Sequence, residues 1–590
     1  MKGVARTVHW LALVLLLSWL PSQPAAADEY RFTGVERVVA IGDVHGAYEG
    51  LVELLRGMEL IDDELEWSGG EAHLVSLGDL LDRGDYGRQV MDLLMRLQDE
   101  AAAAGGAVHV VHGNHEVMNL TGDLRYVSEG DFAQFGDERR GEFPPGFFQR
   151  RDAFAPQGRY GQWLLELPVM VVVNDSLFLH GGIAPLLEGL SLGEVNRASM
   201  RDIRRFAEGW HVLLEAGKVA DDDGLRRIIR AAGSARRSLV EEARQAGNDI
   251  TEAADGLPFV PDGPLWYRGN ARCHPYVETE PTARLLEQFG VQRVVIGHTP
   301  TYNRRINSRL DGRVIAADVG MLTEYYGGIP AALVIEDGKL RAWYLEEGWA
   351  KVEPEPNRTW DRPGDMSDAE IEEFLRNAEV KRVDRERRGR PRRVLLERDG
   401  LKVEAVFNTR DSVPGLERGR WRRAAERADR YQHEIVAYRL DRLLDLQMVP
   451  VTVERTIDGD TGSLRLWLPG SFSEEERRAE QIPFRGSCDL APMYDLMSVF
   501  DLLIFNADHD LATLRYDRNW QLWLTDQSRA FGLATDVEST LRRSDLQVSP
   551  QLREALGRID RERIEELAPE LHSRQIEALL NRARQLRQAR

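Results

Sequence analysis

Short apolar runs alternate with longer amphipathic stretches through the first 345 residues of the chain. The runs are rich in β-branched residues, and seven of them are predicted strands: Val38–Ile41, Leu74–Leu77, Val108–Val111, Val169–Val173, Leu177–Leu179, Val294–Ile296 and Val314–Ala317. Continuous apolar runs of this length are typical of strands buried between layers, so the pattern predicts an α/β fold. Asp337 and Gly338 separate two further runs, Ala332–Glu336 and Lys339–Leu345, and predict a tight hairpin.

The remaining pattern divides the chain into further parts. Residues 186–254 are charged with a helical periodicity, which predicts a helical insert within a first domain of residues 28–345. Residues 346–364 carry several prolines and few apolar positions, which predicts a linker. Ser367 and Glu370 then form a capping-box pattern, which indicates that a helix opens a second domain over residues 365–590.

The N-terminus has the pattern of a secretory signal peptide over residues 1–27. Lys2 and Arg6 precede the apolar run Leu11–Leu20, and the small residues Pro24–Ala27 follow it. The apolar run is shorter than the roughly 20 residues that span a bilayer, although an uncleaved anchor remains an alternative. We therefore expect an exported protein, periplasmic or extracellular, with no membrane span once the signal is cleaved.

Composition narrows the class of protein. With 590 residues the chain exceeds the size of one core, about 250–300 residues, so more than one domain is expected. A composition of 43% hydrophobic and 29% charged residues excludes a disordered or multi-span membrane protein. The net charge of −20 argues against nucleic acid as a partner. Cys273 and Cys488 could pair in an oxidising compartment, but they fall in different predicted domains, so a disulfide between them is not the interpretation that we favour.

Polar clusters follow five of the predicted strands. They are Gly42-Asp43-Val44-His45-Gly46, Gly78–Gly84, Gly113-Asn114-His115-Glu116, His180-Gly181-Gly182 and Gly297-His298-Thr299. Ligand sites of open α/β sheets lie outside the carboxyl ends of the strands, so the clusters should converge. Carboxylate, imidazole and amide oxygen suit divalent Mn, Fe or Zn, whereas an iron–sulfur or cysteine-rich zinc site needs thiolates. One cluster alone would indicate a turn or a hydrogen-bonded core histidine, but five in order predict a metal centre.

These five clusters match, in order and spelling, the motifs of the phosphoprotein phosphatase branch of the metallophosphoesterases. Three longer segments most resemble the Shewanella-like bacterial phosphatases within that branch: Gly113–Leu120, Asn174–His180 and Leu265–Gly269. The resemblance implies a calcineurin-like β-sandwich flanked by helices, with layers in the order α-β-β-α. It also implies a hydrolase that acts on phosphomonoesters.

The resemblance further implies a centre of two divalent ions, held by Asp43, His45, Asp79, Asn114, His180 and His298. Asp43, His45 and Asp79 would hold one ion. Asp79 would bridge to the second ion, because a carboxylate can join two ions about 3.5–4 Å apart. Manganese is the first expectation, with iron and zinc as alternatives.

The same resemblance assigns roles to four further residues. His115 would protonate the leaving oxygen, with Asp82 orienting its ring, while Arg83 and Arg268 would bind phosphate oxygens and a hydroxide between the ions would attack phosphorus. For Arg268, a surface arginine is the alternative. The expected substrates are phosphoproteins carrying phosphotyrosine, phosphoserine or phosphothreonine. Alternatives are a phosphoesterase for dinucleoside polyphosphates or small molecules, and a protein that binds phosphorylated ligands without turnover.

Aromatic residues near the motifs are candidates for a cleft that accepts an aromatic side chain: Phe147, Phe148, Trp163, Trp266, Tyr267, Tyr325 and Tyr326. Ordinary packing is the interpretation that we favour for them.

The pattern of the second half resembles atypical kinases of the phosphoinositide and Golgi secretory-pathway type. That resemblance implies an α+β kinase-like domain with Asp508 as catalytic base, Asp526 as metal ligand and Glu434 as the helix glutamate. Asn408 stands where a lysine is expected, and Thr513 where an asparagine metal ligand is expected. We therefore expect a degenerate module that binds a nucleotide or a protein. A purely structural domain and a working kinase are the alternatives.

Two basic residues near Asn408 are candidates to replace the missing lysine. Lys402 has the same strand parity, but it lies six residues away, or roughly 20 Å at about 3.3 Å per residue. Arg410 is closer, although nothing in the sequence favours it.

Overall fold

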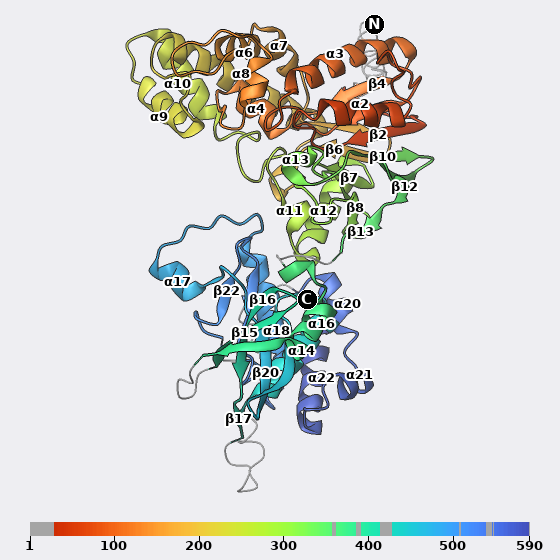
Figure 1. Ribbon diagram of the computed structural model, residues 1–590, viewed down its shortest axis with the longest axis vertical. Coiled ribbons are helices and arrows are strands. Elements are labelled where there is room, and N and C mark those ends of the chain that lie inside the picture. The colour runs from red at the N-terminus through yellow and green to blue at the C-terminus, as the bar shows by residue number, and fades with distance from the viewer. Residues whose placement is uncertain are drawn as a thin grey trace, which may run out of the picture.

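The computed structural model describes residues 29–356, 362–384, 391–413, 428–506, 509–537, 546 and 548–588. Two domains follow one another along its longest axis (Figure 1). The predicted signal peptide and Asp508 lie outside the described residues. None of the described helices combines the length and apolar character that a membrane crossing requires.

Two sheets form the centre of the first domain. The order of the seven-stranded sheet is β1 (Arg31–Phe32), β5 (Met170–Val173), β6 (Ser176–Leu179), β7 (Arg293–Ile296), β9 (Val314–Ala316), β8 (Asn307–Arg309) and β13 (Glu353–Pro354). The order of the six-stranded sheet is β12 (Gly348–Lys351), β11 (Lys339–Tyr344), β10 (Ala331–Glu336), β2 (Arg37–Ile41), β3 (His73–Ser76) and β4 (Ala107–Val110). The seven predicted strands and the hairpin are present, with bounds shifted by a residue at several ends.

Alternate residues of the strands face two different cores. Val38 and Ala40 of β2 pack into a core shared with Phe178 and Val295 of the other sheet. Val39 and Ile41 point the other way, into the core shared with the helices. Because successive side chains of a strand alternate between faces, this division gives a sandwich of two sheets covered by helices. The expected layer order α-β-β-α is therefore present.

The helices of the first domain cover the outer faces of the sandwich. They are α2 (Tyr48–Gly57), α3 (Gly87–Ala104), α4 (Asn114–Leu120), α5 (Glu129–Ala133), α6 (Phe147–Phe154), α7 (Arg159–Leu164), α8 (Leu192–Glu215), α9 (Leu225–Ala235), α10 (Glu241–Ala253), α11 (Gly269–Arg272), α12 (Pro275–Phe289) and α13 (Thr323–Tyr326), with a short 3₁₀ turn at Pro185–Leu187. Helices α8 to α10 occupy the predicted insert and share a small core of their own. They project from the sandwich at the upper left of Figure 1.

The predicted linker is wrong in its first half. Strand β12 pairs with β11, and β13 pairs with β8, so the sheets of the first domain extend to Pro354. Both strands lie at sheet edges, where a proline is tolerated because one side of the strand needs no ladder hydrogen bond. The prolines of this stretch therefore do not exclude strands.

The second domain has a five-stranded antiparallel sheet in the order β14 (Glu379–Val383), β15 (Arg392–Arg398), β16 (Leu401–Asn408), β20 (Asp460–Leu466) and β19 (Thr452–Ile457). A second part holds β21 (Phe472–Ser473), β22 (Leu514–Tyr516) and β23 (Leu522–Leu524). The helices are α14 (Asp368–Asn377), α16 (Tyr431–Leu443), α17 (Glu474–Ala479), α18 (Leu490–Ile504), α20 (Pro550–Leu556), α21 (Arg561–Leu567) and α22 (Ser573–Gln588). A 3₁₀ turn lies at Pro363–Asp365, and the short strands β17 (Asp411–Ser412) and β18 (Asp429–Arg430) pair with each other. The predicted capping box at Ser367 is present.

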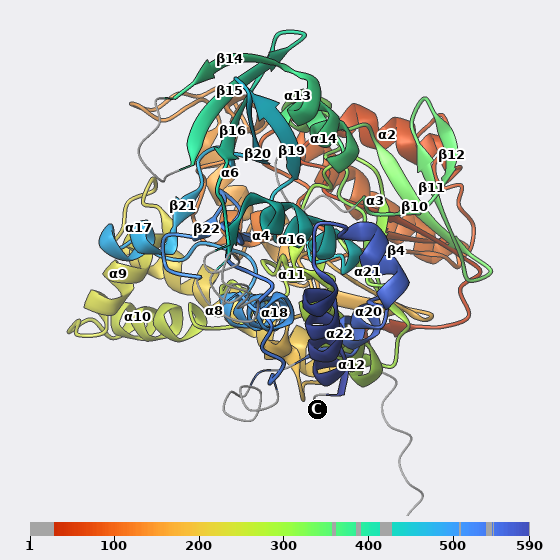
Figure 2. The same ribbon diagram turned by 90° about the horizontal axis from the view of Figure 1, so that it is seen from below.

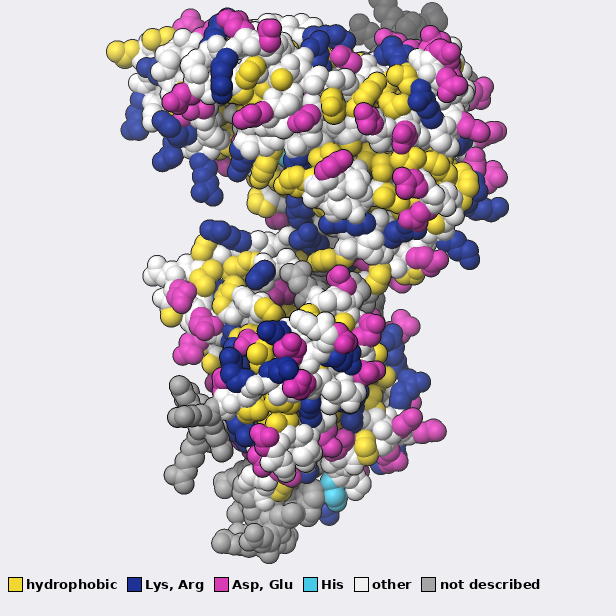
Figure 3. Space-filling view, in the orientation of Figure 1, with side chains coloured by type: hydrophobic (Ala, Val, Ile, Leu, Met, Phe, Trp, Pro, Cys, Tyr) yellow, Lys and Arg dark blue, Asp and Glu magenta, His cyan; other side chains and the backbone are white. Residues whose placement is uncertain are grey.

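A disulfide between Cys273 and Cys488 joins the two domains, with Cα atoms 5.4 Å apart. The pairing that the sequence left open, and that we did not favour, is therefore present. The two cysteines belong to different domains, but Cys273 lies on the face of the first domain that meets the second. Helix α12 follows Cys273 directly and contacts α20 of the second domain, as seen from below in Figure 2. On another side a notch separates the domains (Figure 3).

Candidate metal centre

The predicted metal ligands gather at the carboxyl ends of five strands. Strands β2, β3 and β4 run parallel in one sheet, and β6 and β7 run parallel in the other. Each of these strands delivers one or two buried side chains to the same place: Asp43, His45, Asp79, Asn114, His180 and His298. All six predicted ligands are thus brought together.

The two carboxylate oxygens of Asp79 face two different groups of side chains. Asp79 Oδ2 lies 3.6 Å from His45 Nε2, which is itself 3.8 Å from Asp43 Oδ2. Asp79 Oδ1 lies 3.3 Å from His180 Nε2, which is 3.0 Å from Asn114 Oδ1 and 3.1 Å from His298 Nδ1. Ligand atoms of Asp79, His180 and His298 lie within 4.8 Å of one another, and the same holds for His45, Asp79 and His115. This arrangement fits a carboxylate that bridges two ions.

Backbone carbonyls fix the orientation of two of these histidines. His45 Nδ1 lies 3.0 Å from the carbonyl of Leu81, and His180 Nδ1 lies 2.8 Å from the carbonyl of Leu77. A ring nitrogen that donates to a carbonyl leaves the other nitrogen as a lone-pair donor. The Nε2 atoms of both rings are therefore prepared to bind a cation.

The loops that carry the ligands turn sharply. His45, Asp79 and His298 have left-handed backbone conformations, with φ of 48°, 51° and 64°. Such conformations are costly for residues with side chains and concentrate at functional sites. At Gly78, with φ of 87°, a Cβ atom would collide with the backbone of Gly113. The glycines of these motifs allow the loops after β3 and β4 to touch.

The ionisable side chains of the centre would be stabilised by a bound cation. Burial raises the pKa of Asp43 well above its usual range, and Asp318 nearby acts in the same direction. Burial also opposes ionisation of Asp79, but His180 and His115 hold its pKa well below its usual range. His180 is buried, which disfavours its charge, yet Asp79 and Asp43 raise its pKa to about 9. Buried carboxylates and imidazoles of this kind fit divalent metal ions.

Two residues that support the metal centre were not predicted. Glu116 accepts hydrogen bonds from the backbone amides of Asp79, Leu80 and Gly113 at 2.7–2.8 Å, so it holds the ligand loops in place. Its position inside the third motif could have identified it as part of the site. Asp318 is buried directly after β9, and its Oδ2 has no hydrogen-bond partner among the described residues. Asp318 follows the predicted strand Val314–Ala317, and this position could have identified it as a candidate site residue.

His115 and Asp82 form the expected pair. His115 Nδ1 lies 2.6 Å from Asp82 Oδ2, and Asn119 Nδ2 donates to the other oxygen of Asp82 at 3.0 Å. His115 Nε2 points toward the centre, 3.8 Å from Asp79 Oδ2. Burial disfavours the charged ring, but Asp79 and Asp82 together raise the pKa of His115. The ring is thereby suited to deliver a proton from Nε2.

The two predicted phosphate-binding arginines approach the centre from different sides. Arg268 Nη1 donates to the carbonyl of His298 at 2.8 Å and to Thr299 Oγ1 at 2.9 Å. Arg83 Nη1 contacts His45 Nε2. Arg268 is half-buried, which excludes the alternative of a free surface arginine.

Three of the seven candidate aromatic residues contact side chains of the site. Tyr326 stacks on the ring of His45 at 5.7 Å between centroids, and Tyr325 is 60% exposed. The guanidinium of Arg83 lies 5.3 Å from the ring centroid of Tyr326 and 5.6 Å from that of Tyr325. Trp266 is edge-on to His298. For the others packing holds: Phe147, Phe148, Trp163 and Tyr267 contact neighbouring side chains of the first domain.

A cleft of about 730 Å³ lies beside the centre. Arg83 and Tyr325 line it, together with Tyr48 and Tyr86. Its walls also carry five carboxylates: Glu49, Glu53, Asp85, Glu324 and Glu346. The cleft is therefore acidic, and Arg83 is the basic residue at its edge.

The second domain brings some of its predicted residues together. Asn408 Nδ2 donates to Glu434 at 3.0 Å, and Ser463 Oγ donates to the other oxygen of Glu434 at 2.6 Å. Arg465 lies two residues after Ser463, so it is on the same face of β20, and it was not predicted. Burial lowers the pKa of Arg465, while the nearby carboxylates of Glu434 and Asp526 act in the opposite direction. Lys402 and Arg410, which the sequence offered, pair elsewhere with Glu397 and Asp429.

Thr513 and Asp526 occupy turns after α18. Thr513 Oγ1 accepts from the amide of Asp510 at 3.1 Å within a local turn. Asp526 follows β23 with φ of 65° and accepts from Ser528 Oγ at 2.8 Å.

Part of this chain is similar to known proteins. Residues 36–302 match the family model of the calcineurin-like phosphoesterases. The Shewanella-like protein phosphatase 1 of Plasmodium berghei is 29% identical over 321 residues, which are 53% of this chain and 75% of that protein. The crystal structure of a cold-active protein-tyrosine phosphatase of a psychrophilic Shewanella is 28% identical, with a TM-score of 0.40, over 55% of this chain and 82% of that one.

For the second domain, the structure of hydra Fam20 covers 38% of this chain and 87% of that one, at 17% identity and a TM-score of 0.26. A likeness of this extent decides nothing about the second domain. The match over the first domain agrees with the motifs and with the gathered ligands. Residues 36–302 therefore form a calcineurin-like metallophosphoesterase domain, and the chain is a hydrolase.

Proposed function

We propose that the chain hydrolyses phosphomonoesters on proteins, using two divalent ions held by the six predicted ligands. The observation that carries this proposal is the position of Asp79 between the two histidine groups. When bound, the ions would supply a nucleophile at neutral pH and charge compensation for the phosphoryl oxygens. Manganese remains the first expectation, with iron and zinc as alternatives, since a mixed set of oxygen and imidazole ligands suits all three.

The protein's own residues then orient the substrate and deliver a proton. Arg83 and Arg268 bind phosphoryl oxygens through charge-assisted hydrogen bonds. His115 Nε2 donates a proton to the leaving oxygen, and Asp82 keeps Nδ1 as a donor and stabilises the charged ring. A proton donor positioned in this way contributes about 10²–10⁴-fold to the rate.

The acidic cleft supports a peptide substrate. Its five carboxylates would attract basic residues beside the phosphorylated side chain, and Tyr86 and Tyr325 offer aromatic surface. Dinucleoside polyphosphates carry several negative charges, which these carboxylates would repel. We therefore place phosphotyrosine or phosphoserine/threonine peptides ahead of nucleotide substrates.

The first experiment strips the mature protein of metal, restores Mn²⁺ and follows hydrolysis of an aryl phosphate. We expect metal-dependent turnover, which Asp79→Asn abolishes while the far-UV circular dichroism spectrum stays unchanged. Full activity in a folded Asp79→Asn protein, or turnover without metal, would refute the two-metal proposal. A folded, metal-loaded wild type with no turnover would favour the phospho-ligand binding protein.

A second experiment addresses the substrate. Phosphopeptides flanked by arginine are compared with the same peptides flanked by glutamate, and with a dinucleoside polyphosphate. We expect kcat/KM in the order arginine-flanked, glutamate-flanked, polyphosphate. The double change Glu49→Gln and Glu53→Gln should shrink the difference between the two peptides. A higher kcat/KM for the polyphosphate than for the phosphopeptides would favour the alternative of a dinucleoside polyphosphate hydrolase.

Export to an oxidising compartment is part of the proposal. The signal-like N-terminus supports it, and so does the disulfide, since disulfides persist mainly outside the cytosol. Fractionation of the producing cells, with the protein detected immunologically, tests it.

For the second domain we propose a nucleotide-binding module in which Arg465 replaces the missing lysine. Arg465 is buried beside Glu434 and Asp526, and its Nε has no hydrogen-bond partner among the described residues. A buried guanidinium next to carboxylates could bind the phosphates of a nucleotide whose divalent ion these carboxylates hold. Thr513 stands where a kinase would have an asparagine metal ligand, which favours nucleotide binding without phosphoryl transfer.

Calorimetric titration of the full chain with ADP and Mn²⁺ tests the module. We expect binding that Arg465→Met weakens at least about tenfold, as for a lost charge-assisted contact. Arg410→Met is the matched control and should leave the affinity unchanged. If the folded wild type does not bind ADP with Mn²⁺, the nucleotide-binding proposal is wrong and a purely structural role is the remaining interpretation of this domain.

A further inference from the structure

The segment from Tyr267 to Glu280 lies between the metal centre and the second domain. At its first end Arg268 is tied to the centre, because Nη1 donates to the carbonyl of the ligand His298 and to Thr299. The short helix α11 starts at the next residue, Gly269. Any shift of this helix therefore moves the backbone that carries Arg268.

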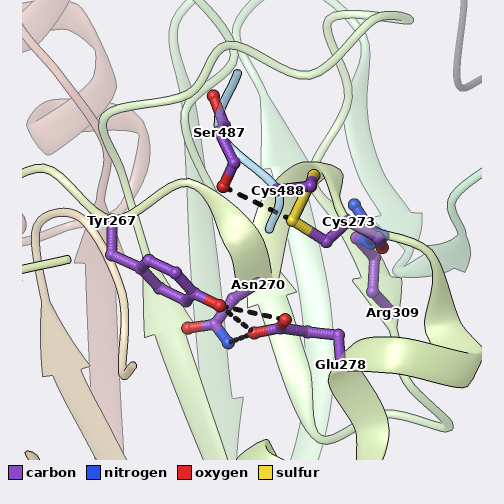
Figure 4. Close-up of a disulfide and its surroundings, with 7 residues drawn as sticks. All are labelled: Tyr267, Asn270, Cys273, Glu278, Arg309, Ser487 and Cys488. Atoms are coloured by element: carbon purple, nitrogen blue, oxygen red, sulfur yellow. Dashed lines mark hydrogen bonds between the residues drawn. A yellow bond between two sulfur atoms is a disulfide. The ribbon is translucent and has the colours of Figure 1, made fainter. Parts of the chain in front are cut away.

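Cys273 is the first residue after α11, and its disulfide partner Cys488 belongs to the second domain. The four residues of α11 span about 6 Å at 1.5 Å per residue, so the bridge is anchored close to Arg268. Figure 4 shows the bridge with Ser487, whose carbonyl lies 3.6 Å from Cys273 Sγ. On the other side Arg309 Nη2 donates to the carbonyl of Cys273 at 2.8 Å.

Buried hydrogen bonds make the segment stiff between these two ends. Tyr267 donates its hydroxyl to Glu278 at 2.9 Å, and Asn270 Nδ2 donates to the same carboxylate at 2.8 Å. Asn270 Oδ1 accepts from the amide of Ile183, which follows the His180 motif. Figure 4 shows Tyr267 and Asn270 converging on Glu278. A displacement at Cys273 is therefore passed on to Arg268 and is not absorbed locally.

The start of α12 adds two contacts to the second domain. His274 Nε2 lies 3.1 Å from the carbonyl of Asp445, and Tyr276 donates its hydroxyl to the carbonyl of Leu444 at 2.6 Å. These contacts and the disulfide hold one side of the segment, while the metal centre holds the other.

We propose that the second domain positions Arg268 for phosphate binding, through the Cys273–Cys488 disulfide and the contacts of His274 and Tyr276. The cysteines are positioning residues, and Arg268 is the group through which they act. The proposal rests on the proposed phosphatase function. It gives the second domain a role in substrate binding by the first, whatever else that domain binds.

The covalent part of the link is reversible. Reduction by a dithiol breaks the S–S bond with two electrons and two protons, which leaves the thiols of Cys273 and Cys488 and converts the dithiol to its own disulfide. The hydrogen bonds of His274 and Tyr276 remain after this step. We therefore expect a graded loss of phosphate affinity on reduction and a larger loss when Tyr276 is also changed.

The test compares Cys488→Ser with the wild type in the full, metal-loaded chain. We expect KM for a phosphopeptide, and the inhibition constant of inorganic phosphate, to rise about 3–10-fold, with kcat within about twofold. Cys273→Ser and reduction of the wild type should give the same change, and Cys488→Ser with Tyr276→Phe a larger one. Ser487→Ala keeps the bridge and is the matched control, expected to equal the wild type.

The decisive measurement introduces Cys488→Ser into an Arg268→Ala protein. Arg268→Ala alone should raise the two constants about 10–100-fold, because a charge-assisted phosphate contact is lost. If the bridge acts through Arg268, Cys488→Ser adds nothing in this background. An equal rise in both backgrounds would overturn the proposal, and so would unchanged constants in a Cys488→Ser protein.

A failed phosphatase assay is distinguishable from a failed positioning proposal. If the metal-loaded wild type turns over no phosphomonoester, the proposed function is wrong. In that case stabilisation of the protein by inorganic phosphate, measured as a shift in Tm, still reports phosphate binding. A smaller Tm shift with phosphate in Cys488→Ser than in Ser487→Ala would then show that the disulfide affects phosphate binding, and equal shifts would show that it does not.

Discussion

At the scale of single residues, the chemistry of this protein depends on how its histidines are oriented. His45 and His180 use Nδ1 for backbone carbonyls and turn Nε2 inward. His115 instead uses Nδ1 for the carboxylate of Asp82. At Nδ1 a carbonyl fixes the tautomer, whereas a carboxylate also stabilises the protonated ring; Asp79, which raises the pKa of His180, lies instead at Nε2, where a metal ion would replace the proton. The same residue type can therefore serve as a metal ligand in one place and as a proton donor in another.

His115→Gln tests this division. We expect kcat for a phosphotyrosine peptide to fall about 10²–10⁴-fold, and less for an aryl phosphate with an acidic phenol, because that leaving group needs less protonation. Metal content, measured by atomic absorption, should stay unchanged. Equal losses on both substrates would assign His115 a binding role instead.

Asp82→Asn should act through the same ring. Asp82 raises the pKa of His115, so its removal lowers that pKa. Activity that needs protonated His115 would then be lost at a lower pH on the alkaline side of the kcat profile. A profile that keeps its alkaline limb would contradict the pairing.

At the scale of elements, helix α6 is locked to the loops of the metal centre by one arginine. Arg150 is buried and donates Nε to Asp131 at 2.8 Å and Nη1 to Asn119 at 2.7 Å. Asn119 in turn donates to Asp82. The helix thus supports the proton-donating pair from behind.

Arg150→Met should destabilise the first domain by about 3–5 kcal/mol, because it leaves the buried carboxylate of Asp131 unpaired. Arg140→Met is the matched control, since Arg140 and its partner Glu138 are exposed and a solvent-screened pair of this kind should change the stability little. Urea unfolding followed by tryptophan fluorescence measures both. Similar losses for the two variants would show that the Arg150 pair is not the lock inferred here.

At the scale of the whole molecule, the two domains share the segment that contains Glu278. Burial raises the pKa of Glu278 to about 7, against the hydrogen bond from Tyr267, which lowers it. The folded protein therefore binds this proton more tightly than the unfolded chain does. Its contribution to stability is present below the unfolded pKa of 4.5 and is lost as the pH rises through about 7.

Glu278→Gln removes this dependence. We expect the free energy of unfolding of the variant, relative to the wild type, to rise by up to about 1.4 kcal/mol per pH unit between pH 4.5 and about pH 7, with a parallel rise in relative Tm. Differential scanning calorimetry at four pH values measures it, with the exposed Glu280→Gln as control. A constant difference between Glu278→Gln and the wild type would mean that Glu278 stays ionised throughout this range.

Much of the first domain was predictable. Its strands have unbroken apolar runs because both of their faces are buried, and its ligands follow these runs in recognisable motifs. The edge strands β12 and β13 were missed because an edge strand needs neither an apolar run nor an absence of proline. Asp318 was missed because it stands alone after β9, without a motif around it.

The buried strands of the first domain and the six candidate ligands could be predicted from the residues alone, since both depend on residues close together along the chain. Only the tertiary structure decided which distant residues meet. Cys273 pairs with Cys488 across 215 positions, Arg465 of β20 lies near Glu434 of helix α16, and Tyr326 stacks on His45. Such contacts depend on how the domains and loops pack, and no periodicity or spacing in the sequence records that.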